Sequence, residues 1–524
     1  MDFIKLTAAQ AFTRFLAAQR NEHGEKLFEG VWAIFGHGNV AGLGQALHEV
    51  KDILPTFRGH NEQSMAHAAI AFAKQNRRKK MMAVTSSIGP GATNMVTAAA
   101  LAHVNRLPVL FIPGDVFGNR APDPVLQQIE DFSDGTVSAN DCFKPVSRYF
   151  DKISRPEHLL TALPRAMATL TDATNCGPVT MSFCQDVQSE SFEFPSEFFN
   201  ERIWHTRRLQ PDEIEFAAAA QKIREASSPV IVAGGGVHYS EATEQLRLFV
   251  EKYHVPVTET QAGKSVLAWD HPLNYGPVGV TGSTSANQLF ETADLVIGIG
   301  TRFQDFTTGS WSLFGDLPIV TINASPYDAH KRNATPLVSD AKVALERLSV
   351  ELGNTTFLDP NEQLKIDWFQ SVDPLTDPPV SDQALPTDMQ VIGAVQRKSS
   401  VDTVVMCAAG TMPGELHKLW KATVPGSYHM EYGFSCMGYE IAGALGIKMA
   451  DPSRHVICMV GDGSYMMMNS ELATAVMMGI DFTVVITDNR GFGCINRLQI
   501  ATGGAEFNNL LDDSVHQNPS NIDF

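Results

Sequence analysis

Cysteine is scarce in this 524-residue sequence, and the few that occur form no recognisable pattern. The seven cysteines are scattered and never spaced as Cys-x-x-Cys, a spacing common in zinc sites and redox motifs. Long hydrophobic runs are also missing: none reaches the ~18 residues of a membrane span, and the N-terminus lacks a signal-peptide pattern. We therefore expect a cytoplasmic protein with neither disulfides nor a membrane partner.

Basic residues are also fewer than acidic residues. Lys and Arg together number 40 against 58 Asp and Glu, which gives a net charge of -18. Nucleic-acid binding depends on clustered basic side chains that neutralise phosphates. The one basic run, at 77–80, follows an expected helix and is interpreted as its solvated end. The composition predicts no nucleic-acid partner.

Short apolar runs alternate with helix-length segments along the whole chain. Apolar residues at three- and four-residue spacing predict helices over 63–74 and 212–225. Alternation of this kind is typical of α/β folds with doubly wound parallel sheets. The expected buried strands are 31–35, 81–85, 108–112, 230–233, 295–299, 404–407, 456–460 and 482–487.

Two polar, proline-containing stretches, 188–211 and 358–386, resemble linkers. They divide the sequence into three expected α/β domains, at 1–190, 205–355 and 385–524. Ligands of such sheets bind at the carboxyl ends of the strands. The glycine-rich turns that follow several expected strands are therefore the places to look for a site.

The most specific of these turns is Gly461-Asp462-Gly463-Ser464, which follows an expected strand. Asp488-Asn489 follows the next strand, so the side chains of Asp462 and Asn489 should converge at one sheet edge. A carboxylate, an amide oxygen and the Gly491 carbonyl suit Mg²⁺, which prefers oxygen ligands and leaves positions for phosphates. The glycines would allow close backbone approach, and the helix start at Ser464 would favour an anion. A lone Gly-Asp-Gly is also a common turn, but the pair at this spacing is more specific.

This pair of motifs resembles the cofactor motif of thiamine-diphosphate enzymes. The resemblance implies that Asp462, Asn489 and the Gly491 carbonyl hold Mg²⁺ on the diphosphate of the cofactor. The sequence departs from the family at Asp488, where the first Asn of the closing pair is usual. The resemblance also implies three domains: a pyrimidine-binding, a middle and a diphosphate-binding domain.

The family activates its cofactor with a glutamate in the first domain, and Gly59-His60-Asn61-Glu62-Gln63 is similar to that segment. Glu62 would share a proton with N1′ of the aminopyrimidine. The loop at 85–94 resembles a second family segment, in which Asn94 would lie beside the pyrimidine. From the residues alone, Glu62 could instead be a helix N-terminal charge, or a metal ligand together with His60 and His67.

Met437-Gly438 resembles the segment whose bulky side chain holds the two cofactor rings in a V-shape. Packing in the core is the alternative for a methionine. In the middle domain, Gly234-Gly235-Gly236 fails the dinucleotide motif because the third required glycine is Tyr239. Some relatives bind FAD there, and the sequence leaves FAD open.

Segments at 34–40, 59–63 and 123–130 are most similar to the ring-opening hydrolases of the family, which act on a cyclic 1,2-diketone in myo-inositol breakdown. The resemblance implies hydrolysis of a carbon–carbon bond, giving 5-deoxy-glucuronate. His37, Gln127 and His60 are candidates for holding substrate hydroxyls or activating water, although each could be a structural polar residue. The alternative activities are an acetohydroxyacid synthase-like carboligase or decarboxylase acting on a 2-oxo acid, and an inactive binding protein.

The resemblance also implies an oligomer, because in the family the first domain of one subunit and the third domain of another enclose one cofactor. We expect at least a homodimer, with a homotetramer as the preferred assembly. The family's third domain continues well beyond the closing Asn motif, whereas this sequence ends at Phe524. A C-terminally short third domain is therefore expected.

Overall fold

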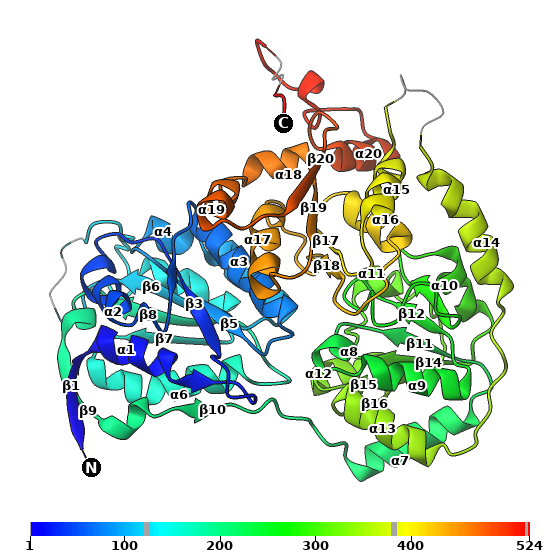
Figure 1. Ribbon diagram of the computed structural model, residues 1–524, viewed down its shortest axis with the longest axis horizontal. Coiled ribbons are helices and arrows are strands. Elements are labelled where there is room, and N and C mark those ends of the chain that lie inside the picture. The colour runs from blue at the N-terminus through cyan, green and yellow to red at the C-terminus, as the bar shows by residue number, and fades with distance from the viewer. Residues whose placement is uncertain (1, 120–122, 124, 379–384, 519–521) are drawn as a thin grey trace. The chain divides into compact units, whose positions relative to one another are not determined.

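Three parallel β-sheets organise the chain, as the alternating pattern predicts. The computed structural model describes residues 2–119, 123, 125–378, 385–518 and 522–524 (Figure 1). By their contacts the residues form two compact units. The first unit contains residues 1–207, 438–453 and 465–482, and the second contains 208–437, 454–464 and 483–524. Each unit is thus assembled from separate stretches of sequence.

The first unit is built on a six-stranded sheet in the order β4-β3-β5-β6-β8-β7, with every neighbouring pair parallel. Its strands β3, β5, β6 and β8 are almost wholly buried, because parallel sheets are covered on both faces. The strands are β3 (Phe28–Ala33), β4 (Thr56–Phe57), β5 (Met81–Ser86), β6 (Leu110–Asp115), β7 (Tyr149–Ile153) and β8 (Val179–Cys184).

Two small sheets extend this unit. β1 (Phe3–Thr7) pairs antiparallel with β9 (Ser191–Pro195), and β2 (Gln19–Arg20) pairs with β10 (Arg202–Ile203). Part of the stretch expected to be a linker is therefore ordered sheet in the first unit.

Helices of the first unit come from both ends of the sequence. α17 (Glu440–Ala450) lies beside α3 in Figure 1, where the orange and blue helices run together. A Cβ atom on Gly446 would lie 2.1 Å from the Ala68 carbonyl oxygen, so only glycine permits this approach. The other helices are α1 (Ala8–Ala17), α2 (Gln45–Glu49), α3 (Glu62–Gln75), α4 (Pro90–Thr93), α5 (Val96–Asn105), α6 (Leu159–Leu170) and α19 (Glu471–Met478).

The second unit contains the middle sheet, in the order β13-β12-β11-β14-β15-β16, again parallel throughout. Its strands are β11 (Pro229–Ala233), β12 (Val257–Glu259), β13 (Asn274–Pro277), β14 (Leu295–Ile299), β15 (Ile319–Asn323) and β16 (Thr335–Val338). The associated helices are α7 (Glu213–Glu225), α8 (Gly236–Tyr239), α9 (Thr243–Tyr253), α10 (Thr284–Gln288), α11 (Asp305–Thr308), α12 (Pro326–Ala329), α13 (Ala341–Glu351) and α14 (Gln363–Val372).

The same unit contains a four-stranded parallel sheet in the order β18-β17-β19-β20. Its strands are β17 (Val404–Cys407), β18 (Tyr428–Met430), β19 (Val456–Gly461) and β20 (Thr483–Thr487). Its helices are α15 (Asp388–Lys398), α16 (Met412–Leu419) and α20 (Gly493–Ala501), and α18 (Asp462–Met467) begins in this unit and ends among the residues of the first. The chain therefore has the α/β class and parallel sheets that the sequence predicts.

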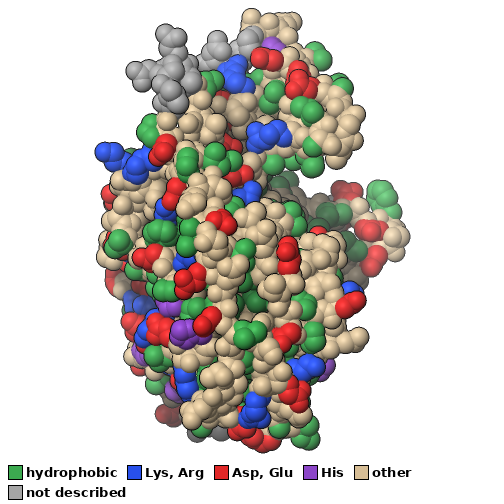
Figure 2. Space-filling model, turned by 90° about the vertical axis from the view of Figure 1, so that its right-hand side faces the viewer, with side chains coloured by type: hydrophobic (Ala, Val, Ile, Leu, Met, Phe, Trp, Pro, Cys, Tyr) green, Lys and Arg blue, Asp and Glu red, His purple; other side chains and the backbone are tan. Residues whose placement is uncertain are grey.

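Acidic and basic side chains are interspersed on the face shown in Figure 2. All seven cysteines are free thiols, as expected from their spacing. Within the described ranges, no helix combines the length and the apolar character that crossing a membrane requires.

Candidate functional site

Glu62 is the first residue of α3 and lies where the chain leaves the short strand β4. The helix is capped by the preceding residue, since the Asn61 side chain accepts a hydrogen bond from the Ser64 amide at 3.0 Å. Glu62 is half-buried, and its Oε2 accepts a hydrogen bond from Asn94 Nδ2 at 2.8 Å. The structure thus brings together two residues that the sequence predicts at one end of the cofactor.

The glycine-rich loop after β5 lies against this carboxyl group. A Cβ on Gly91 would be 3.2 Å from Glu62 Oε1, and a Cβ on Gly89 would be 1.9 Å from the Gln127 carbonyl oxygen. Gly89 also has a positive φ of 67°, which disfavours other residues. The two glycines therefore let the loop approach Glu62 on one side and the Gln127 segment on the other.

The turn that carries His37 rests on the same loop. A Cβ on Gly36 would lie 2.4 Å from Ser87 Oγ, and a Cβ on Gly38 would lie 2.9 Å from the Ile88 amide nitrogen. His37 and Gln127 both have exposed side chains. Neither side chain hydrogen-bonds Glu62, although all three residues belong to the described part of the chain. Their backbone positions border the loop, and their roles toward substrate stay predictions.

His60 is held by residues that the sequence did not suggest. Its Nδ1 is 2.8 Å from Thr474 Oγ1, and its backbone amide donates to Glu471 Oε1 at 3.1 Å. Among the described residues, no three His, Cys, Asp or Glu side chains gather as a metal site would require. The alternative reading of His60, Glu62 and His67 as metal ligands is therefore wrong.

Asp462 lies in the second unit, at the carboxyl end of β19, and is buried with 6% of its surface exposed. Its carboxylate accepts hydrogen bonds from the Asn489 amide at 3.2 Å and the Gly491 amide at 2.8 Å. Burial raises the pKa of the Asp462 carboxyl above its ordinary value, while these two hydrogen bonds lower it. The turns after β19 and β20 do converge at one sheet edge.

The residues around Asp462 are packed closely except at one glycine. A Cβ on Gly463 would lie 2.7 Å from the Phe492 ring, and Gly491 has a φ of 139° and a Cβ there would lie 2.4 Å from the Asn509 carbonyl oxygen. A Cβ on Gly461, in contrast, would meet no described atom within 4 Å, and the close approach of a diphosphate to this glycine stays a prediction. Ser464 is buried in α18.

Met437 is half-buried at the end of a loop. Two backbone amides of this loop donate hydrogen bonds to the same buried carboxylate. Glu431 accepts hydrogen bonds from the amides of Phe434 at 2.9 Å and Cys436 at 2.8 Å. Gly438 follows in the first unit with a φ of 83°, and a Cβ there would lie 2.7 Å from Met468 Sδ. Position 438 therefore requires glycine.

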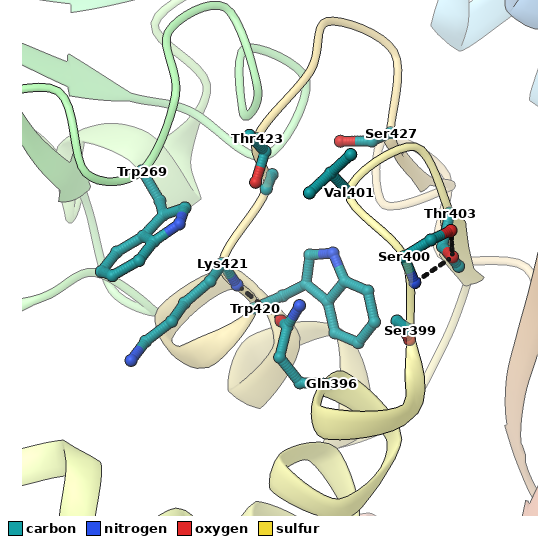
Figure 3. A pocket seen from close by; sticks show the side chains of 11 residues that line it. Trp269, Gln396, Ser399, Ser400, Val401, Thr403, Trp420, Lys421, Thr423 and Ser427 are labelled. Atoms are coloured by element: carbon teal, nitrogen blue, oxygen red, sulfur yellow. Dashed lines mark hydrogen bonds between the residues drawn. The ribbon is translucent and has the colours of Figure 1, made fainter.

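A pocket of about 200 Å³ in the second unit lies elsewhere (Figure 3). Thr403 and Ser427, which line it, precede β17 and β18, so it is at the amino ends of the strands, away from Asp462 at their carboxyl ends. Ligands of parallel sheets bind at the carboxyl edge. The pocket contains none of the predicted site residues and is not the candidate site.

Comparison with protein-family models identifies the chain. The model for the N-terminal thiamine pyrophosphate binding domain matches residues 28–134, and that for the central domain of thiamine pyrophosphate enzymes matches 216–348. The model for the C-terminal thiamine pyrophosphate binding domain matches 408–524. Because the matches cover more than half of the chain, it belongs to the thiamine pyrophosphate enzyme family.

Several curated relatives carry the same name. A protein of Geobacillus thermodenitrificans (strain NG80-2) named 3D-(3,5/4)-trihydroxycyclohexane-1,2-dione hydrolase is 46% identical, with 97% of this chain and 83% of the relative covered. Proteins of the same name from Clostridium tetani (strain Massachusetts / E88) and Bacillus cereus (strain AH820) are 44% and 45% identical, with 97% of this chain and 84% of each relative covered.

The residues present fit thiamine diphosphate and Mg²⁺. Asp462 and Asn489 offer carboxylate and amide oxygens, which keep free lone pairs beside the hydrogen bonds described above, and Mg²⁺ takes such ligands. The absence of a side chain at Gly91 lets the loop approach the Glu62 carboxyl. Asp462, Asn489 and the Gly491 carbonyl would hold the metal, and Glu62 would face the pyrimidine.

Proposed function

We propose that this protein hydrolyses a carbon–carbon bond of 3D-(3,5/4)-trihydroxycyclohexane-1,2-dione, opening the ring to 5-deoxy-glucuronate. The observation that carries the proposal is identity of 44–46% to hydrolases of that name over 97% of the chain. The hydrogen-bonded pair of Glu62 and Asn94 supports it, because the chemistry needs a carboxyl group held in one orientation.

When bound, thiamine diphosphate supplies a carbon nucleophile for a substrate carbonyl. In our proposal Glu62 holds a proton in common with N1′ of the pyrimidine, and Asn94 orients the Glu62 carboxyl by its 2.8 Å hydrogen bond. Asp462, Asn489 and the Gly491 carbonyl would hold Mg²⁺, which would supply charge neutralisation for the diphosphate. Gly463 and Ser464 would contribute to the diphosphate site, and Met437 would contact the rings of the cofactor.

Substrate contacts are assigned to the turn of His37 and to Gln127, which border the Ser86–Gly91 loop in the first unit. The substrate is rich in hydroxyl groups, which need polar partners when they leave water. His37 has an imidazole and Gln127 an amide, and both side chains are exposed. Each can donate and accept hydrogen bonds.

The test is product analysis with the purified chain. Incubation with the diketone, thiamine diphosphate and Mg²⁺ should give the ring-opened acid, and omission of the cofactor should abolish its formation. The same protein should release little carbon dioxide from pyruvate. Rapid decarboxylation of pyruvate without ring opening of the diketone would assign the protein to the 2-oxo acid enzymes instead.

We further propose that the active form is at least a homodimer, with a homotetramer as the preferred assembly. The proposal is supported by the match of separate N-terminal and C-terminal thiamine pyrophosphate binding domains, since the family resemblance implies that one cofactor is enclosed by these domains from two subunits. Sedimentation with the cofactor present should give a dimer or larger species. A monomer that turns over substrate would contradict this.

A further inference from the structure

A buried carboxylate anchors the turn before Glu62. Glu471, with 1% of its surface exposed, accepts hydrogen bonds from the backbone amides of His60 and Asn61, each at 3.1 Å. It also accepts the hydroxyl proton of Thr474. All of these residues belong to the first unit, in which α19 brings Glu471 and Thr474 to the start of α3.

The contacts determine which ring nitrogen of His60 carries hydrogen. A carboxylate can only accept hydrogen bonds, and a hydroxyl group has one proton to donate. Because Thr474 donates its proton to Glu471, its oxygen must accept from His60 Nδ1, which is 2.8 Å away. His60 Nδ1 is then the protonated nitrogen, and Nε2 has a free lone pair. An orienting partner at one nitrogen commonly fixes the state of the other.

His60 is accessible to solvent near the start of α3. Its side chain is exposed, and it lies two residues before Glu62, the residue assigned to cofactor activation. A base oriented by a second group and within reach of a reactant is the usual arrangement for general base catalysis. When Nε2 takes up a proton, the resulting positive charge is linked to the Glu471 carboxylate through the Thr474 hydroxyl.

We propose that His60 is the general base that activates the hydrolytic water, and that Thr474 and Glu471 are positioning residues for it. This rests on the proposed hydrolase function. One O–H bond of water breaks, its proton binds Nε2, and the oxygen forms a bond to a substrate carbonyl carbon. Addition opens the C=O π bond to an alkoxide; when this π bond re-forms, the carbon–carbon bond breaks, its electron pair goes to the other carbon, and that carbon takes the proton from Nε2, so that one molecule of water is added overall.

The experiment compares His60→Ala with His60→Asn. The asparagine amide can still donate to Thr474, so this variant keeps the anchor of the turn and lacks only the base. Both variants should hydrolyse the diketone about 100-fold more slowly, a loss in kcat rather than in KM. Added imidazole should restore part of the rate in His60→Ala, which a purely structural role would not allow. A His60→Asn variant as fast as the wild type would overturn the proposal.

Thr474 offers a matched pair of variants. Thr474→Val removes the hydroxyl between the imidazole and the carboxylate and should lower kcat about 10-fold, whereas Thr474→Ser keeps it and should restore nearly the full rate. Equal rates for the valine and serine variants would remove the positioning role.

Exchange of the C2 proton of thiamine diphosphate, followed by NMR, separates this step from cofactor activation. The exchange rate in the His60 variants should stay within about twofold of the wild type, because the base acts on water. A parallel loss of exchange would overturn the assignment. A wild-type protein that exchanges the C2 proton but does not open the diketone would instead refute the proposed function, and the role of His60 with it.

Discussion

The side-chain amide of Asn94 donates a hydrogen bond to Glu62 Oε2 at 2.8 Å. Glu62 begins α3, and Asn94 is the residue that ends α4, so the hydrogen bond joins the start of one helix to the end of another. A hydrogen bond to a charged group restricts the carboxyl to one orientation. The pair therefore determines where Glu62 can exchange a proton.

Replacing Glu62 by glutamine should leave the fold intact and remove the proton exchange with the pyrimidine. We expect kcat to fall about 10²- to 10⁴-fold, the usual contribution of a general acid–base group. Exchange of the cofactor C2 proton should fall in parallel. Glu197→Gln, at an exposed position of the same unit, is the matched control and should behave as wild type. A Glu62→Gln protein with normal C2 exchange would exclude the assigned role.

Asn94→Ala removes the hydrogen bond and keeps the carboxyl group. A hydrogen bond to a charged group contributes about 1.5–3 kcal/mol, so kcat should fall about 10- to 100-fold, less than in Glu62→Gln. The control is Asn200→Ala, at an exposed position of the first unit. Steady-state rates of Glu62→Gln, Asn94→Ala and Asn200→Ala test this ranking of the losses in kcat. A loss in Asn94→Ala as large as that in Glu62→Gln would contradict the prediction.

Asp462→Asn should weaken Mg²⁺ binding at least about 10-fold, because the metal loses its only predicted carboxylate ligand. Titration of activity with Mg²⁺ measures the effect, and high metal concentrations should recover part of the rate. Asp488→Asn is the control: this exposed carboxylate accepts a hydrogen bond from the Arg490 amide at 2.9 Å. Equal metal dependence in the two variants would argue against Asp462 as a ligand.

Gly89→Ala should destabilise the first unit and displace the Gln127 segment, since the new methyl group would lie 1.9 Å from a carbonyl oxygen. Two controls separate the causes. Gly24 has a φ of 76°, but a Cβ there would meet nothing within 4 Å. Gly24→Ala should therefore lower the free energy of unfolding only by the backbone strain, about 1 kcal/mol. Gly135→Ala also meets nothing within 4 Å and lacks the positive φ. Thermal unfolding midpoints should fall in the order Gly135, Gly24, Gly89, and a Gly89 variant as stable as the Gly24 variant would contradict the contact.

Acid should destabilise the first unit through His67. Its ring packs edge-on against Tyr439, and burial lowers the pKa of His67 to about 3. Because histidine in the unfolded chain titrates near 6.5, only the unfolded chain gains this proton between about pH 6.5 and 3, and stability falls as pH falls through that window. The slope from this group is about 1.4 kcal/mol per pH unit.

Urea unfolding of the wild type and His67→Gln over the upper part of this window measures the effect. Glutamine does not titrate, so the difference in free energy of unfolding between the two proteins should change with pH. A difference that is the same at every pH would show that the pKa of His67 is the same in the folded and the unfolded chain, and would contradict this prediction.

The central strands could be predicted because burial on both faces requires continuous apolar runs. The expected strands at 295–299 and 404–407 have the bounds of β14 and β17. The edge pair of β1 and β9 could not be predicted in this way: β9 has mixed polarity, and its residues resemble a linker. β9 forms a strand because it pairs with β1, which lies near the other end of the domain in the sequence.

The same limit applies to the site. The pairing of Asp462 with Asn489 follows from topology, since adjacent parallel strands end at one edge. Glu471 and Thr474 were missed, because nothing in the local sequence around either residue indicates His60 as a partner. Contacts of this kind depend on helix packing, and the passage of α17 beside α3 depends on Gly446.

Glu471 and His60 are 411 positions apart in the sequence, and this separation matters while the protein is being made. At translation rates of about 5–20 residues per second, roughly 20–80 seconds pass between the synthesis of the turn and the synthesis of its anchor. During that interval the turn before α3 lacks the hydrogen bonds to Glu471 that hold it in the finished protein.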